Sequence, residues 1–197
     1  MKIRQSPKLP AKVRRGQLLE SALSLFLKKG YQATTTEAIA RHAGVSKGSL
    51  YFHFSSKEDL LCELARAMID SFSEALKAVK GKRMTPVDMF RFMGRIDQEM
   101  PHPEARNNLS LLSEAIKVPR IRRMVDEMWT LMVSNLASCL DPAYARTAAR
   151  RRQIVIMIGA IYDGLQLARY FHPDEIDFDL QARTMAAVFK PVSNSKR

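Results

Sequence analysis

The sequence predicts an all-helical protein of about nine helices, and three observations support this prediction. Apolar residues recur three and four positions apart along the chain, which is the spacing of one face of a helix. No strand-like alternation of apolar and polar residues persists anywhere. Glycine and proline interrupt the apolar pattern at intervals that suit helix ends, at Gly30, Gly44, Gly81, Pro86, Pro101, Pro103, Pro119, Pro142 and Pro173.

Composition and charge limit the classes of protein to which the chain can belong. Its 197 residues carry 32 Lys and Arg against 20 Asp and Glu, a formal net charge of +12 that attracts nucleic acid first and an anionic membrane surface second. Hydrophobic residues make up 46% of the chain, too many for a disordered protein. Cys62 and Cys139 are too few for a disulfide scaffold, so we expect a cytoplasmic protein. The longest apolar run, Ile154 to Tyr162, is too short to span a bilayer, and no membrane segment is expected.

Positive charge is concentrated in the N-terminal part of the chain. Residues 1–60 hold eleven Lys and Arg against four acids, a net charge of +7. Residues 1–11 contain three basic residues, two prolines and no acid, which predicts a flexible basic arm. A tail that only improves solubility is the alternative. A second flexible segment is expected at residues 191–197.

The first helix is expected from about Lys12 to Lys29. Gly30 follows it and is suited to the left-handed conformation that often ends a helix. The residues predicted to share one face of this helix are Leu19, Ala22, Leu23 and Phe26.

A short second helix is predicted after a run of threonines. Thr34 and Glu37 have the spacing of a capping box, with Thr35 and Thr36 as alternative caps. The residues expected to point inward before Gly44 ends this helix are Ile39, Ala40 and Ala43.

A third helix is predicted to open at Ser46, after a tight corner at Gly44. Ala40 is small enough to let two helices cross closely, and Gly44 permits a backbone turn that other residues rarely adopt. Two short helices joined by such a corner form a helix-turn-helix motif, here at residues 35–54.

Three consecutive rings lie within the third helix, at Tyr51, Phe52 and His53. Leu50 and Phe54 are one turn apart and claim the buried face. At least two of the three rings are therefore predicted to be exposed, where they need a partner. DNA suits them, because hydroxyl and imidazole groups bond phosphate oxygens.

The residues that begin this helix support a DNA-binding interpretation. Lys47 can reach the acceptor atoms of guanine, Gly48 would let the helix approach the groove closely, and Ser49 lies beside them. The helix N-termini at Thr36 and Ser46 offer backbone N–H groups to anions. A helical enzyme that contains the same spacing by chance is the alternative.

Ser55 or Ser56 is predicted to cap a fourth helix, whose first turn holds two acids as suits the helix dipole. This helix would run to about Val79 and link an N-terminal head to a larger body. Further helices are expected near residues 86–100, 104–117, 119–140, 144–171 and 176–190. The expected domains are an arm (1–11), a helix-turn-helix domain (12–58), a ligand-binding and dimerisation body (59–190) and a tail (191–197).

Residues 13 to about 65 resemble the TetR/AcrR family. The similarity runs through the pattern Thr-Thr-x3-Ile-Ala-x3-Gly-Val-Ser-Lys-Gly-Ser-Leu-Tyr-x-His-Phe-x-Ser-Lys-Glu-Asp-Leu. In that family the matching positions lie at or near DNA, which implies contacts for Thr36, Ser46, Lys47, Gly48, Tyr51, His53 and Lys57. Together with the residues argued above, the candidate DNA contacts are Thr35, Thr36, Ser46, Lys47, Gly48, Ser49, Tyr51, Phe52, His53 and Lys57. Phe52 departs from the Tyr or Trp of many members and loses any hydroxyl contact to phosphate.

The resemblance implies a homodimer that binds a palindromic operator in double-stranded DNA, with its recognition helices about 34 Å apart. It also implies a repressor that is released when the body binds a small apolar or amphiphilic effector. A nonspecific architectural DNA-binding protein and a helical enzyme with a basic surface are the alternatives. No enzymatic activity, metal or other cofactor is expected, because the sequence lacks a phosphate-binding glycine loop, a nucleophile elbow and histidines at metal-ligand spacing.

Methionine is concentrated in the body, since nine of the eleven methionines lie beyond residue 80. Flexible methionine side chains suit an adaptable pocket. The candidate effector contacts are Met93, Met128, Trp129, Tyr162 and Gln166. Ordinary packing between helices is the alternative for each of them.

The run from Ile154 to Leu167 is apolar on nearly every face, and such a helix needs cover on both sides. A second copy of the chain would cover one side, as in the four-helix dimer interface of the resembled family. Complete burial within one subunit is the alternative. The candidate interface residues are Ile154, Ile158, Ile161, Leu165, Ala182, Met185, Ala186 and Phe189.

Overall fold

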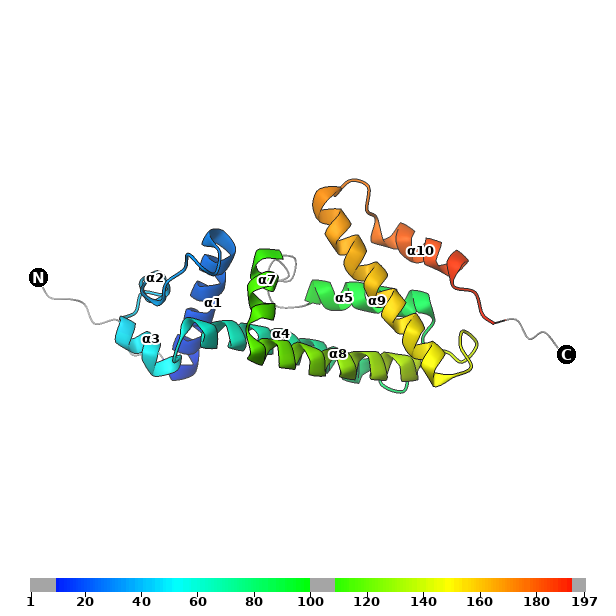
Figure 1. Ribbon diagram of the computed structural model, residues 1–197, viewed down its shortest axis with the longest axis horizontal. Coiled ribbons are helices and arrows are strands. Elements are labelled where there is room, and N and C mark those ends of the chain that lie inside the picture. Colours follow the sequence, from blue (N-terminus) through cyan, green and yellow to red (C-terminus); the bar gives the residue numbers. More distant parts are fainter. Residues whose placement is uncertain (1–9, 100–108, 193–197) are drawn as a thin grey trace, which may run out of the picture. The chain divides into compact units, whose positions relative to one another are not determined.

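The computed structural model describes residues 10–99 and 109–192, apart from the side chains of 109–112 (Figure 1). Within these residues the protein consists of nine helices and no strand, so the predicted all-helical class is confirmed. An isolated β-bridge joins Met84 to Leu140. The helices are α1 (Ala11–Lys29), α2 (Thr36–His42), α3 (Lys47–His53), α4 (Lys57–Val79), α5 (Pro86–Glu99), α7 (Leu109–Lys117), α8 (Pro119–Cys139), α9 (Ala148–Phe171) and α10 (Phe178–Val188).

One predicted helix start needs correction. The helix expected from residue 144 begins at Ala148 instead, because residues 141–147 form turns. Thr147 caps α9, and its hydroxyl accepts a hydrogen bond from the backbone N–H of Arg150 at 3.2 Å. The predicted arm (1–11) and tail (191–197) lie almost wholly outside the described residues, as does the predicted helix start at residue 104.

The chain divides into two compact units. The head unit comprises the described residues 10–66 and 109–122, and the body unit comprises 67–99 and 123–192. Both α4 and α8 contribute residues to each unit. α7 and the first turn of α8 therefore belong to the head unit, although the sequence pattern groups them with the body.

The head unit has a small apolar core. α1 packs against α2, and α2 packs against α3. Leu18, Ala22 and Phe26 of α1 are at most 1% exposed. Leu19, which is predicted to share this face, is only partly buried, because Leu18 takes the inward position.

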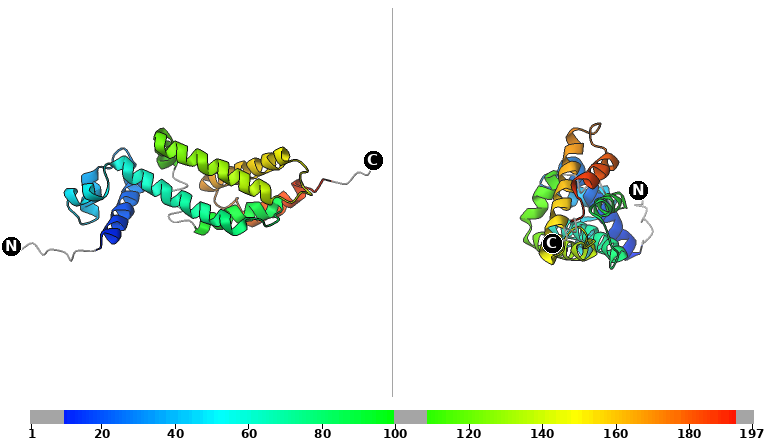
Figure 2. Two further views of the ribbon diagram at one scale, coloured as in Figure 1. Left: turned by 90° about the horizontal axis from the view of Figure 1, so that it is seen from below. Right: turned by 90° about the vertical axis from the view of Figure 1, so that its right-hand side faces the viewer.

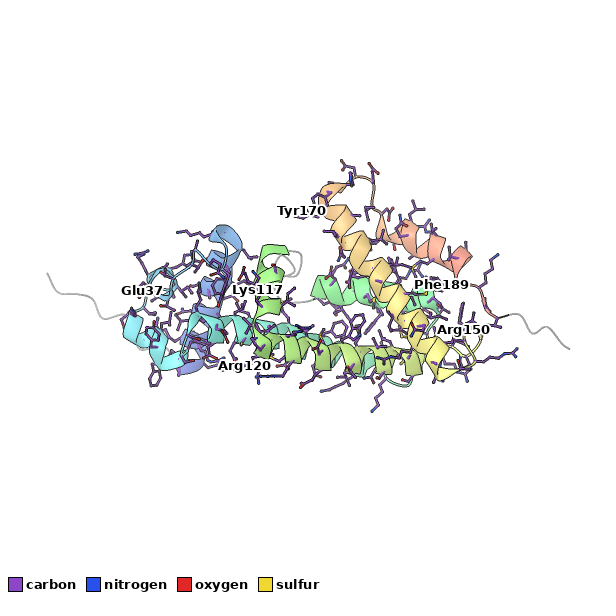
Figure 3. The ribbon with its side chains drawn as sticks, in the orientation of Figure 1. Glu37, Lys117, Arg120, Arg150, Tyr170 and Phe189 are labelled. Atoms are coloured by element: carbon purple, nitrogen blue, oxygen red, sulfur yellow. The ribbon has the colours of Figure 1, made fainter. Side chains whose placement is uncertain are left out.

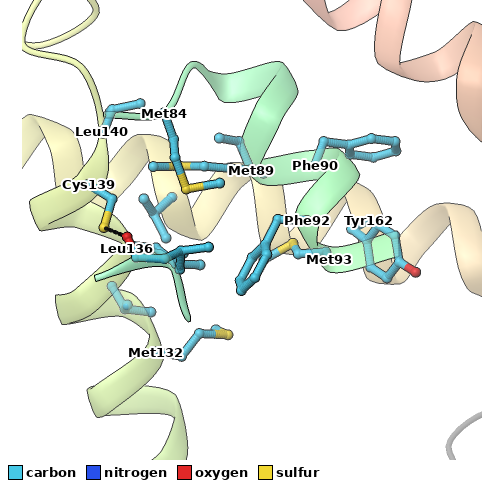
Figure 4. Close-up of a cluster of buried hydrophobic side chains, with 14 of the residues drawn as sticks. Met84, Met89, Phe90, Phe92, Met93, Met132, Leu136, Cys139, Leu140 and Tyr162 are labelled. Atoms are coloured by element: carbon cyan, nitrogen blue, oxygen red, sulfur yellow. Dashed lines mark hydrogen bonds between the residues drawn. The ribbon is translucent and has the colours of Figure 1, made fainter. Parts of the chain in front are cut away.

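The body unit is built around α5. Both α9 and α10 pack against α5 (Figures 1 and 2). Their side chains form one apolar cluster with parts of α4 and α8, and Figure 4 shows Met89, Phe92 and Tyr162 among the buried side chains. The Cys139 thiol donates a hydrogen bond to the backbone carbonyl of Val79 at 3.3 Å. This bond gives the buried thiol of Cys139 a hydrogen-bond partner.

α9 combines a long apolar stretch with extensive exposure. Among the described helices, it alone is long and apolar enough to cross a membrane by length and composition, which the short uninterrupted run from Ile154 to Tyr162 does not indicate. In its most apolar 18-residue window, 22% of the residues are buried. Val155 and Ile158 lie in the core, whereas Met157 and Ile161 are 52% and 37% exposed. One side of α9 therefore packs in the body unit, and apolar side chains remain exposed elsewhere on the helix.

Candidate nucleic-acid interface

The corner between α2 and α3 is fixed by two side-chain caps. Thr35 precedes α2, and its hydroxyl accepts a hydrogen bond from the backbone N–H of Ala38 at 3.1 Å. Ser46 precedes α3 and accepts one from Ser49 at 3.1 Å. Between them Gly44 has a φ of 66°, a conformation that residues with a side chain rarely adopt. The predicted corner is confirmed, with Thr35 as the cap of α2.

Thr34 does not act as the predicted capping residue. It is buried, and its hydroxyl lies 2.8 Å from the carbonyl oxygen of Gly30 and 3.3 Å from that of Leu25. The Glu37 carboxylate bonds Lys47 and its own backbone N–H. The capping-box prediction is therefore wrong, because the end of α1 already holds the Thr34 hydroxyl.

The three consecutive rings of α3 differ in exposure. Phe52 is 81% exposed and Tyr51 is 45% exposed. His53 is half-buried, and its ring packs edge-on against Phe52 with centroids 5.1 Å apart. Leu50 and Phe54 are 0% and 1% exposed. The prediction that at least two of the rings are exposed is confirmed, because Leu50 and Phe54 occupy the inward side of this short helix.

Four polar side chains join α2 to α3 at the surface, and we call Thr36, Glu37, Lys47 and Tyr51 the α2–α3 face. The hydroxyl oxygens of Thr36 and Tyr51 are 3.1 Å apart and share one hydrogen bond. The Lys47 ammonium forms an ion pair with the carboxylate of Glu37, which lies on α2 (Figure 3). The same ammonium lies 5.8 Å from the centre of the Tyr51 ring. These contacts link α2 to α3 at the surface and bring the four side chains together.

The ion pair keeps both of its members charged. A hydrogen bond from Lys47, together with one from Glu37's own backbone N–H, lowers the pKa of Glu37 to about 2. The same bond to Glu37 raises the pKa of Lys47. The two side chains are 51% and 55% exposed, so the pair remains accessible to a partner. Glu37 is absent from the predicted contacts, although it is the one acid between Thr35 and His53 in the sequence.

Gly48 is exposed, and none of the described residues crowds this position closely enough to require a glycine. A Cβ added at Gly48 would meet Ser46 Oγ at 3.9 Å and no nearer atom. An open surface of this kind allows another molecule to approach the backbone closely. Ser49, the next predicted contact, is half-buried, and its backbone N–H is used by the Ser46 cap.

Lys57 lies at the start of α4, and its side chain turns into the protein. Its ammonium donates hydrogen bonds to the carbonyl oxygens of Tyr31, Thr34 and Gln32 at 2.7, 2.9 and 3.3 Å. It also lies 4.3 Å from the centre of the Tyr31 ring. Burial lowers the pKa of Lys57. The side chain therefore holds the loop between α1 and α2 in place, a role that differs from the DNA contact implied by the resemblance.

Charged side chains of α7 and α8 complete the head unit. Gln32 donates a hydrogen bond to Glu114 at 2.6 Å, and Lys117 pairs with the same carboxylate at 2.8 Å. Hydrogen bonds from Lys117 and Gln32 lower the pKa of Glu114. Arg120, in the first turn of α8 (Figure 3), lies 3.5 Å from Asp59. These contacts connect α7 and α8 to the loop before α2 and to the start of α4.

The predicted effector contacts in the body unit fall into two groups. Tyr162 and Gln166 line a cavity of about 920 Å³, and Gln166 donates a hydrogen bond to the Tyr162 hydroxyl at 2.9 Å. Met93, Met128 and Trp129 are not among the residues that line this cavity. Met93 is 6% exposed in the core, Met128 packs against the core, and Trp129 is 37% exposed.

Other walls of the cavity are aromatic and charged. Phe90 and Phe178 lie 5.5 and 5.4 Å from the Tyr162 ring, centroid to centroid. Arg91 and Arg95 of α5 line the same cavity, together with acidic side chains. Sequence reasoning missed these charged residues, because an exposed Arg on an amphipathic helix ordinarily belongs to the solvated face.

The predicted interface residues of α9 and α10 also divide by exposure. Ile158, Ala182 and Met185 are 0%, 0% and 6% exposed, so they are already buried within the subunit. The remaining candidates are partly buried or exposed: Ile154, Ile161, Leu165, Ala186 and Phe189. Exposed apolar side chains beyond the predicted set are Met157, Leu167, Tyr170, Phe171, Leu180 and Val188.

Within residues 10–99 and 109–192, no group of three or more His, Cys, Asp or Glu side chains is placed to hold a metal ion. The polar groups that gather at the α2–α3 face are suited to hydrogen bonding and charge contacts.

Comparison with known proteins agrees with this geometry. The family model described as bacterial regulatory proteins, tetR family, matches residues 18–64, which include both α2 and α3. The transcriptional repressor KstR2 of Mycobacterium tuberculosis is 51% identical over 57 residues, which cover 29% of this chain and 28% of that relative. The chain therefore matches less than a third of the length of that relative.

Two further proteins match over most of their length. A transcriptional regulator from Saccharomonospora viridis, solved in complex with choline, has a TM-score of 0.64 at 19% identity, over 90% of this chain and 95% of that one. The transcriptional activator FasR of Mycolicibacterium smegmatis is 40% identical over 171 residues, which cover 85% of this chain and 76% of FasR. The chain belongs to the TetR family of bacterial regulatory proteins.

Proposed function

We propose that the protein is a sequence-specific transcriptional regulator that binds a palindromic operator as a homodimer. The observation that carries this proposal is the exposure of Lys47, Tyr51 and Phe52 on a short helix whose opposite side is locked into the core. Exposed cations and rings on a rigid helix suit the major groove and its phosphates. Membership of the TetR family supports the same function.

Each exposed group of α3 has a role that fits its chemistry. Lys47 can donate to the O6 and N7 acceptors of guanine, and the Tyr51 hydroxyl can bond a phosphate oxygen. His53 offers a ring nitrogen to phosphate, and Phe52 offers an apolar ring to a thymine methyl group. Lys57 acts indirectly in this proposal, since it holds the loop that carries the cap of α2.

A second copy of the chain is proposed to cover the exposed apolar side chains of α9 and α10. Ile161, Leu167 and Val188 are 37%, 44% and 71% exposed, and burying them against an identical surface removes apolar area from water. Pairing places two heads on one DNA duplex. Their recognition helices would enter successive major grooves about 34 Å apart.

The body cavity is proposed to bind an effector. Aromatic rings on one wall and charged side chains on others favour an amphiphilic molecule over a purely apolar one. The choline complex of the structural neighbour supports the capacity of this fold to hold a small organic molecule. Screen compounds by thermal shift and titrate each binder into an operator complex; binders that never alter operator affinity would refute an effector role.

Repression by blocking the promoter is the proposed outcome of operator binding. Among the relatives, KstR2 is named a repressor and FasR an activator. Fusing the operator to a reporter gene distinguishes the two, because a repressor lowers transcription when the protein is expressed and an activator raises it.

Selection of binding sites from random double-stranded DNA tests the function itself. The full chain should enrich an inverted repeat with half-sites about 10 base pairs apart, centre to centre. Enrichment of DNA without any shared sequence would instead favour the nonspecific architectural alternative.

A further inference from the structure

Glu37 stands out on the α2–α3 face because its charge opposes DNA binding. DNA carries one negative charge for about every 1.7 Å of its helix axis, so a carboxylate beside the recognition helix is repelled by every sequence. Glu37 is nevertheless 51% exposed, and its partner is the first residue of α3. Its ordinary structural role, a capping box, is already excluded by the geometry at Thr34.

A carboxylate in the major groove is stabilised where the DNA offers a hydrogen-bond donor. Cytosine presents its N4 amino group there without an adjacent acceptor. Adenine also presents an amino group, but its N7 acceptor lies beside it and repels the second carboxylate oxygen. Guanine and thymine offer acceptors in the same positions. Of the four bases, cytosine is therefore the best partner for Glu37.

Lys47 complements this preference. Its ammonium contacts the Glu37 carboxylate directly, so donor and acceptor atoms from the two helices lie side by side. In a G·C base pair the O6 acceptor of guanine and the N4 donor of cytosine also lie side by side, because they bond each other across the pair. Glu37 and Lys47 can consequently contact the cytosine and the guanine of one base pair while they remain paired with each other.

We infer that Glu37 and Lys47 together read a single G·C base pair in each half-site, with Glu37 accepting from cytosine N4 and Lys47 donating to guanine O6 or N7. Glu37 then raises specificity because it weakens binding to DNA that has another base at this position more than it weakens binding to DNA that has cytosine there. The inference rests on the proposed operator-binding function and names the base pair that this part of the face recognises.

The test uses the full chain and an operator recovered by site selection, with four variants. Glu37→Gln removes the charge while keeping the size of the side chain, and Glu37→Ala removes the group. Glu74→Gln is the matched control, since Glu74 forms a comparable exposed ion pair with Lys77 and its substitution also removes one negative charge. Lys47→Ala removes the other member of the pair.

Affinities are measured for the selected operator, for operators substituted at each base pair in turn, and for unrelated DNA. The affinity of the wild-type protein should fall about tenfold when one particular G·C pair in each half-site is replaced by another base pair. Glu37→Ala should reduce that preference to the part that Lys47 supplies, and Glu37→Gln should retain more of it because its amide oxygen can still accept from cytosine N4. Both Glu37 variants should bind unrelated DNA several-fold more tightly. Glu74→Gln should behave as wild type.

Two results would overturn the inference while leaving the operator-binding function intact. In the first, Glu37 variants bind every DNA more tightly by one common factor, which would make Glu37 a general electrostatic brake. In the second, their base preferences and affinities equal those of wild type. Failure of the wild-type protein to prefer any sequence would instead refute the proposed function.

Discussion

At the scale of single residues, the head unit contains two lysines with opposite roles. Lys47 is more than half exposed, and its ammonium lies beside the Tyr51 ring. The Lys57 ammonium instead donates hydrogen bonds to three backbone carbonyl oxygens. Only the first is available to guanine or phosphate. The presence of a lysine in the motif therefore does not show that it contacts DNA, because its ammonium can already be hydrogen-bonded within the protein.

Lys47→Ala and Tyr51→Ala are each expected to weaken operator binding roughly 5- to 150-fold. Both side chains project from α3 and make no core contact that the variants would lose. Circular dichroism should show unchanged helix content. Lys77→Ala, on an exposed part of α4, is the control for loss of one positive charge and should bind as wild type. Unaltered operator affinity in both α3 variants would contradict the assigned contacts.

Some residue roles follow from the sequence and others require the tertiary structure. Leu50 and Phe54 are recognisable because helix periodicity alone fixes their common side. Thr34 and Thr35 have identical side chains, so the sequence does not show which of them caps α2. The structure decides this, because the end of α1 already bonds the Thr34 hydroxyl and Thr35 is left to cap α2. The partners of Lys57 lie 23 to 26 positions away in the chain, beyond any local pattern.

At the scale of elements, α3 depends on its cap. With seven residues it is too short to be stable by itself, and Ser46 satisfies one of its N-terminal N–H groups. Ser46→Ala should lower the free energy of unfolding by about 1 kcal/mol. Urea denaturation measures this change. Ser134→Ala, at an exposed site within α8, should leave stability nearly unchanged, and an equal loss in both variants would argue against a specific capping effect.

The exposed apolar side chains of α9 make a prediction about assembly. Ile161→Asp should convert dimers to monomers, because a charge buried at a subunit interface without a partner is costly. Analytical ultracentrifugation measures the change in mass. Leu131→Asp is the matched control on α8, since Leu131 is also an exposed apolar residue at 48%. Dimers that survive Ile161→Asp, or that dissociate equally in Leu131→Asp, would contradict an interface on α9.

The sequence predicts these helices more readily than it predicts which of their sides are free. α9 is apolar on nearly all sides, so periodicity cannot distinguish Ile158, buried by the subunit itself, from Ile161, which is exposed. The sequence pattern also does not show that α7 and the first turn of α8 belong to the head unit. Their polar contacts there are with Gln32 and Asp59, which are far away in the chain.

At the scale of the whole molecule, charge distribution should appear in the salt dependence of DNA binding. Residues 1–9 add three positive charges per subunit and no acid. Deleting them should weaken operator binding and flatten the plot of log affinity against log salt concentration by up to about 5 in slope for a dimer. The slope is measured between low and physiological salt. An unchanged slope would show that these residues release no counterions and make no phosphate contact.

The central claim is sequence-specific operator binding, and competition at physiological salt tests it most directly. A labelled selected operator is displaced either by the same operator or by a scrambled sequence of equal length and composition. We predict that the scrambled DNA requires about a thousandfold higher concentration or more, as for other specific regulators. Equal displacement by the two DNAs would contradict the claim.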